Sequence, residues 1–161
     1  MEDFRDKLKK ISDQASQEHQ RKVDEKRAEE DRAIDQANRV DNAAKMLEAH
    51  IELRLHEFNQ QFIEFRYKTW VDNGRRFRLY WDEPGSRTNP KQKLHQLQLR
   101  VRRYREYADV EVEVKMIIAN AEKQRRAREE DVYEGDPEKL KQFIDEQIFA
   151  FTQLYVKGRG W

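Results

Sequence analysis

The fold of this chain turns on residues 65–81, which read FRYKTWVDNGRRFRLYW. Aromatic or aliphatic residues alternate with mostly basic ones on both sides of Asn73-Gly74, and an Asn-Gly pair between alternating runs is a strong signal for a β-hairpin. A three-residue loop with Gly74 in the left-handed conformation would place Tyr67 opposite Leu79. We therefore predict two antiparallel strands, one face of which carries Phe65, Tyr67, Phe77, Leu79 and Trp81.

Two further strands are expected over residues 94–104 and 110–116, where apolar residues again alternate with polar ones. A tight turn between them gives a register that pairs apolar with apolar residues and arginine with glutamate, so both kinds of contact favour the same pairing. Residues 121–131 are highly charged and fit a strand end, a loop or a short helix. The predicted pairs are Leu97–Met116, Leu99–Val114, Val101–Val112, Arg100–Glu113 and Arg102–Glu111.

The stretch from about Phe4 to about Phe62 contains no helix breaker, because the first glycine and proline are Gly74 and Pro84. We predict one long helix, or two helices joined without a loop. A continuous helix of about 60 residues would be about 90 Å long. Such a helix has to find a partner, fold back or stand in solvent, which favours a structural or interaction role.

Apolar residues recur at spacings of four and three in both halves of this helix. The first half is weakly apolar, with Phe4, Leu8, Ile11 and Ala15 in this spacing. In the second half the spacing predicts either a coiled-coil-like contact between two helices or packing on the chain's own core, and both interpretations stay open for residues 33–51. For residues 55–65 we favour the chain's own core. The candidate oligomer seam consists of Ala37, Val40, Ala44, Leu47 and Ile51.

A second helix is expected near the C-terminus. Asp136-Pro137-Glu138 is typical of a helix start, and an apolar stripe follows from Leu140 to Tyr155. The predicted fold class is therefore α+β: a long N-terminal helix, a four-stranded antiparallel sheet and a C-terminal helix packed on the sheet. We divide the chain into the charged helix, residues 1–62, and the sheet with its C-terminal helix, residues 63–161, which share one core with the end of the long helix.

The composition excludes several classes of site. Cysteine is absent, so no disulfide, thiolate nucleophile or cysteine-based metal site can form. No apolar run approaches the roughly 18 residues of a membrane span, and the first residues lack the apolar core of a signal peptide. We expect a soluble, cytoplasmic protein that does not enter a membrane.

The sequence offers little that resembles an active site. It has no glycine-rich phosphate loop and no serine in a nucleophile pattern. The best metal-binding group is Glu52 with His56, joined by Glu48, but it lacks the repeated Glu-x-x-His spacing of di-metal bundles. We interpret these residues as helix surface and expect no catalytic residues, no metal and no cofactor.

The charge is unevenly distributed along the chain. Residues 61–128 hold 17 basic and 9 acidic residues, whereas residues 1–60 hold 12 and 15 and residues 129–161 hold 4 and 8. The acidic flanks either neutralise the basic middle internally, or the middle meets an external anion. The predicted registers place basic and aromatic residues together on the second face of the sheet, and the candidate partner- or anion-binding residues are Arg66, Lys68, Trp70, Arg76, Arg78 and Tyr80.

These features indicate a non-enzymatic, self-associating structural or protein-interaction module, which we expect to be a homodimer held by the long helix, either alone or together with the sheet. The basic face would suit an acidic protein partner. The alternative is a nucleic-acid-binding module, because basic groups interleaved with aromatic rings suit the phosphates and bases of a single strand.

Overall fold

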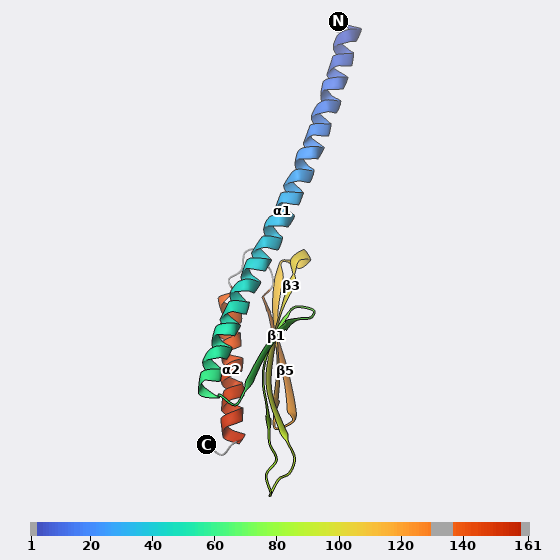
Figure 1. Cartoon of the computed structure of the whole chain (residues 1–161). Helices are drawn as coiled ribbons and strands as arrows, with labels where there is room; N and C mark the ends of the chain where they lie inside the picture. Colours follow the sequence, from blue (N-terminus) through green and yellow to red (C-terminus); the bar gives the residue numbers. More distant parts are fainter. Residues whose placement is uncertain (1–2, 130–136, 159–161) are drawn as a thin grey trace. The chain divides into compact units, whose positions relative to one another are not determined.

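A computed structural model describes residues 3–129 and 137–158 of the chain, except for the side chains of residues 122–129. This part consists of two helices and five strands, with a short 3₁₀ turn between the third and fourth strands (Figure 1). The elements in chain order are α1 (Phe4–Gln61), β1 (Arg66–Val71), β2 (Arg75–Glu83), β3 (Lys93–Tyr104), η1 (Arg105–Tyr107), β4 (Asp109–Ile118), β5 (Ala121–Glu129) and α2 (Glu138–Gly158). The α+β class and the order helix, antiparallel sheet, helix are confirmed.

The strands form one antiparallel sheet in the order β1-β2-β3-β4-β5. The four predicted strands are all present, and the predicted β1–β2 pair Tyr67–Leu79 and all five predicted β3–β4 pairs are observed. The sheet also has a fifth strand, β5, formed by residues of the segment 121–131, for which the sequence left a strand end, a loop and a short helix open. In β5, Arg125 stands opposite Val114 and Ala127 opposite Val112. The segment lacks an apolar alternation, because only Ala121 and Ala127 are apolar, and an edge strand tolerates such a charged sequence.

The long helix is continuous over 58 residues, as expected where neither glycine nor proline interrupts the backbone ladder. Its end is closed by Asn59, whose side-chain amide donates hydrogen bonds to the carbonyl oxygens of Phe62 (3.1 Å) and Phe65 (2.9 Å). These bonds satisfy acceptors at the point where the chain leaves the helix, and they fix the entry into β1.

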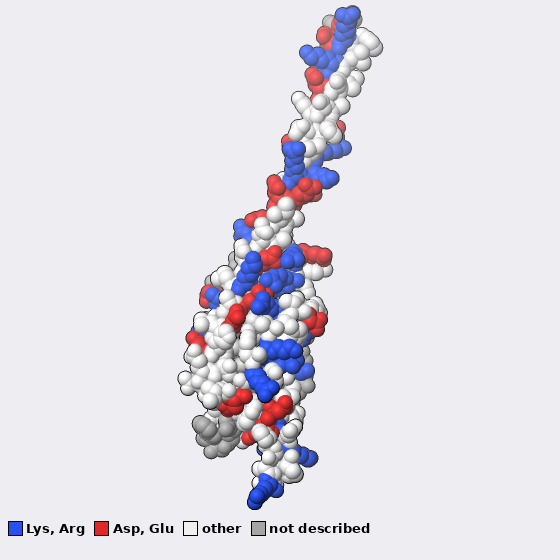
Figure 2. All heavy atoms as spheres, in the orientation of Figure 1, with Lys and Arg blue, Asp and Glu red and all other residues white. Residues whose placement is uncertain are grey.

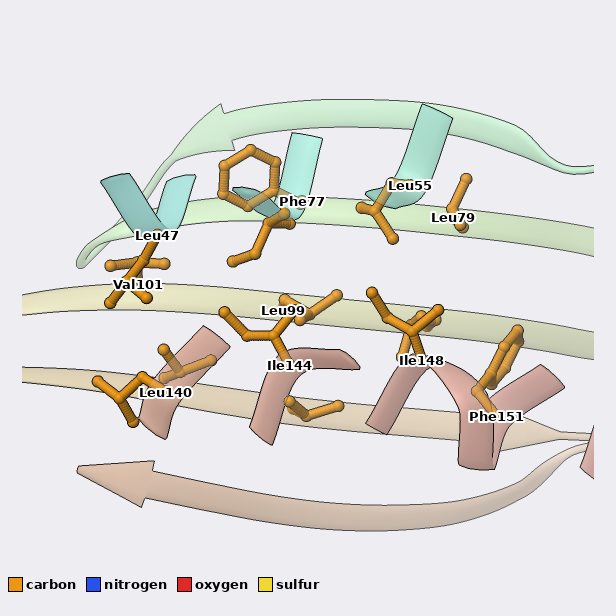
Figure 3. Close-up of a cluster of buried hydrophobic side chains, with 14 of the residues drawn as sticks. Leu47, Leu55, Phe77, Leu79, Leu99, Val101, Leu140, Ile144, Ile148 and Phe151 are labelled. Atoms are coloured by element: carbon orange, nitrogen blue, oxygen red, sulfur yellow. The ribbon is translucent and has the colours of Figure 1, made fainter. Parts of the chain in front are cut away.

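The core lies between the sheet and two helical segments, α2 and the second half of α1. Figure 3 shows leucines of α1 and aliphatic side chains of α2 directed at Phe77, Leu79, Leu99 and Val101 of the sheet. Figure 1 shows both segments on the same face of the sheet. The buried residues that α1 contributes are Val40, Ala43, Ala44, Leu47, Ile51, Leu55 and Phe58.

Charged contacts fasten the second half of α1 to its neighbours. The guanidinium of Arg103 on β3 lies 2.8 Å from the carboxylate of Glu48, and Asp41 lies 2.9 Å from Arg105. Asp145 of α2 accepts a hydrogen bond from Arg54 at 3.0 Å, and Glu57 helps hold the same guanidinium. These hydrogen bonds to two carboxylates raise the pKa of Arg54 above its ordinary value, so the guanidinium stays protonated.

The chain falls into two compact units, Met1–Gln36 and Ala37–Trp161. The second unit contains the whole core, including the part of α1 from Val40 onward. In the first unit the described side chains are almost all exposed. Over their described residues, neither α1 nor α2 combines the length and apolar character that crossing a membrane requires.

Candidate binding surface on the second face of the sheet

The sheet turns its apolar face to the helices and a strongly basic face the other way. The registers of β1–β2 and β2–β3 place all six predicted residues on this second face: those on β2 alternate with the buried Phe77 and Leu79, and those on β1 stand directly opposite those on β2. We call it the basic face; its residues are Arg66, Lys68, Trp70, Arg76, Arg78, Tyr80, Arg100, Arg102, Tyr104, Glu111 and Glu113. Figure 2 shows Lys and Arg side chains grouped where β1 and β2 lie in Figure 1.

Glutamates of β4 neutralise the part of the basic face that lies on β3. Arg100 is buried, and its Nη2 lies 2.7 Å from Oε2 of Glu113. Arg102 lies 3.8 Å from Glu111 and donates a hydrogen bond to the hydroxyl of Tyr104 at 3.2 Å. The hydrogen bond to Tyr104 and the nearby glutamates raise the pKa of Arg102 above its ordinary value. The sequence predicted this neutralisation from the β3–β4 register.

The part on β1 and β2 has a different charge balance. Arg76 lies near Asp72, with 3.8 Å between the charged groups. Arg66, Lys68 and Arg78 form no ion pair with any residue of the described chain. Lys68 stands directly opposite Arg78 in the β1–β2 register, which is a repulsive arrangement of like charges.

An aromatic ring holds these two cations near each other. The Nζ atom of Lys68 lies 5.4 Å from the ring centroid of Trp70, and Cζ of Arg78 lies 4.7 Å from it. Arg78 also lies 5.9 Å from the ring of Tyr80. Cation–π attraction stabilises a positive charge without neutralising it. The ring therefore arranges the cations and leaves their charge available to an anion.

Three arginines of the basic face each bury a nitrogen that lacks an acceptor. The Nε atoms of Arg78, Arg100 and Arg102 are inaccessible to solvent and form no hydrogen bond in the described structure. A buried donor without an acceptor costs about 1–3 kcal/mol. These arginines lie on the neighbouring strands β2 and β3.

A small cleft with two carboxylates lies at the end of the basic face, near the C-terminal end of β2. Arg66, Tyr80 and Asp82 line it together with Glu64, and its volume is about 230 Å³. The two carboxylates make the potential at this end of the face less positive than beside Lys68 and Arg78.

The residues of the predicted oligomer seam are not on the surface, where a contact with a second chain would need them. Val40, Ala44, Leu47 and Ile51 have no exposed surface and belong to the core of the same chain, while Ala37 is half-buried. Of the two interpretations left open for this stripe, the structure therefore has the chain's own core. The physical reason is that a sheet with one apolar face buries a helix stripe as well as a second helix would.

Other charged residues prove to be structural. The sequence did not anticipate that Arg103 and Arg105 are paired with α1, because their partners lie 55 and 64 positions away. Glu48, a member of the metal-binding group considered from the sequence, is the partner of Arg103. The ring of His56 lies tilted against that of Tyr67, with the ring centroids 5.3 Å apart. Among the described residues, no cluster of three or more histidines and carboxylates is arranged to hold a metal ion.

A search of protein-family models, curated proteins and solved structures found no match to this chain.

Proposed function

We propose that the chain is a non-enzymatic protein-interaction module that associates with a second copy of itself through residues 4–36 of α1. The observation that carries this proposal is a stripe of large apolar side chains that the described chain leaves in solvent. Phe4, Leu8 and Ile11 are 73%, 51% and 65% exposed, and their spacing places them on one side of the helix.

A helix with an exposed apolar stripe becomes more stable when a second helix covers the stripe. Helices in proteins owe most of their stability to packing of an apolar face, and isolated helices are marginal in water. Within residues 4–36 the structure offers surface contacts such as the pair Arg21–Glu25 at 3.8 Å, which contributes only about 0.3–0.5 kcal/mol. Full burial of one Leu or Ile side chain contributes about 1.5–3 kcal/mol. A second helix would supply this burial.

A second copy of the chain is the partner that the charges and spacing favour. Residues 4–36 hold nine basic and nine acidic residues, so two copies approach without net repulsion. The spacing of four and three is the one that interlocks two helices in a coiled coil, and a pair of identical stripes is complementary to itself.

The test is the solution mass of a variant with a disrupted stripe. Leu8→Glu combined with Ile11→Glu places charges in the proposed contact and is expected to convert a dimer into a monomer in light scattering. The core should be unaffected, because both residues lie outside the unit that contains it. Thermal unfolding followed by near-ultraviolet circular dichroism checks this, since the aromatic rings lie in that core.

The matched control is Gln17→Glu combined with Gln20→Glu, which adds the same two negative charges on the other side of the helix. Both glutamines are exposed. The control should keep the mass of the dimer. If the stripe variant and the control have the same mass as the unaltered chain, self-association through this stripe is refuted.

A further inference from the structure

Three cations of the basic face, on β1 and β2, meet no carboxylate of the described residues at ion-pair distance, and this distinguishes them from other basic groups in the chain. Arg103 and Arg105 are paired with carboxylates of α1, and Arg100 and Arg102 with glutamates of β4. Arg66, Lys68 and Arg78 form no such pair in the described residues. The internal neutralisation that the acidic flanks offer therefore stops short of β1 and β2.

The geometry of these three residues suits a chain of anions. Arg66 and Lys68 are two positions apart on β1, so their side chains leave the sheet on the same side about 6.8 Å apart. Arg78 stands directly across from Lys68 on β2. An anion between Lys68 and Arg78 would relieve the repulsion between them, and a second anion would meet Arg66 along the strand.

The aromatic rings distinguish a nucleic acid from an acidic peptide. Trp70 and Tyr80 lie on the same face among the three cations, and neither belongs to the buried core. The carboxylates of an acidic peptide would bind to the cations and would make no use of the aromatic rings. The bases of an unpaired strand gain stacking energy from such rings while the phosphates meet Lys and Arg.

We propose that the β1–β2 part of the basic face binds single-stranded nucleic acid. Phosphates contact Arg66, Lys68 and Arg78, and bases stack against Trp70 and Tyr80. The glutamates beside Arg100 and Arg102 bound the site on the β3 side, and Glu64 and Asp82 line a cleft together with Arg66 and Tyr80 at its other end.

The test is a fluorescence anisotropy titration of the full chain with labelled oligothymidylate and oligouridylate. Three phosphate contacts on a single strand predict that affinity falls about 20-fold when salt rises from about 50 to about 200 mM. Changing all three cations, Arg66→Gln, Lys68→Gln and Arg78→Gln, should remove most of the binding and flatten the salt dependence. Trp70→Leu should weaken binding at least about fivefold through lost stacking.

The control removes the same charge elsewhere. Lys45→Gln, Lys139→Gln and Lys157→Gln change three exposed lysines of α1 and α2 outside residues 4–36 and should leave the affinity within about twofold, since long-range attraction is largely screened by salt. Unfolding by urea checks that the sheet variants keep their fold. The proposal is overturned if no oligonucleotide binds at low salt, if the control weakens binding as much as the sheet variant, or if polyglutamate displaces the oligonucleotide at equal charge concentration.

Discussion

At the scale of single residues, Gly74 shows how closely the hairpin and the sheet depend on each other. Its backbone has a φ of +106°, which L-residues rarely adopt. A Cβ atom built on Gly74 would lie 2.5 Å from the carbonyl oxygen of Val101 on β3. The turn thus needs glycine both for its conformation and because β3 approaches closely, and the same turn sets the register that builds the basic face.

Gly74→Ala should therefore be costly. We expect it to lower the free energy of unfolding by at least about 2 kcal/mol, since strained backbone and a steric clash add together. Equilibrium denaturation in urea measures the change. Gly158→Ala is the control: a Cβ there meets nothing within 4 Å, and that substitution should be neutral or slightly stabilising. Equal stability of the two variants would contradict the role given to Gly74.

At the scale of elements, α1 combines two kinds of surface in one uninterrupted helix. Residues Val40 to Phe58 pack on the sheet and on α2, whereas the side chains of residues 4–35 are almost all exposed. The spacing of apolar residues by itself does not reveal this division, because the four-and-three spacing occurs both at residues 4–15 and at residues 33–51. The two parts differ in what packs against them: the sheet and α2 cover the second part, and their residues are distant from α1 in the sequence.

Leu47 and Leu53 test this division within one helix. Leu47 has no exposed surface, while Leu53 is 55% exposed. Leu47→Ala should lower the free energy of unfolding by about 2–5 kcal/mol, because it leaves a cavity in the core. Leu53→Ala should change it by about 0.5 kcal/mol or less. Both values come from urea denaturation with the same protein concentration, and a similar loss in the two variants would be inconsistent with the packing described here.

The strands differ in how far they could be predicted. β1 to β4 alternate apolar and polar residues, so local pattern, register and charge pairing all favour one arrangement. β5 has no such alternation, since only Ala121 and Ala127 of its residues are apolar. Its existence depends on backbone hydrogen bonds to β4, which leave little mark on the sequence.

At the scale of the whole molecule, the fold apart from β5 and the residues of the basic face could be predicted from the sequence, but which charged residues form ion pairs could not. Arg103 and Arg66 both look like surface cations in the sequence. The structure pairs Arg103 with Glu48, while Arg66 meets no carboxylate at ion-pair distance in the described chain. Such long-range pairing follows from tertiary packing, which local patterns do not encode. The same holds for the seam at Leu47, which a sheet covers.

The central claim is that the exposed stripe of α1 brings two copies of the chain together. Sedimentation equilibrium of the unaltered protein at several micromolar concentrations tests it most directly, because the measured mass does not depend on shape. The chain has a mass of 19.7 kDa, and the account predicts a mass of twice that value, with dissociation on dilution. A mass of 19.7 kDa at every concentration would contradict it.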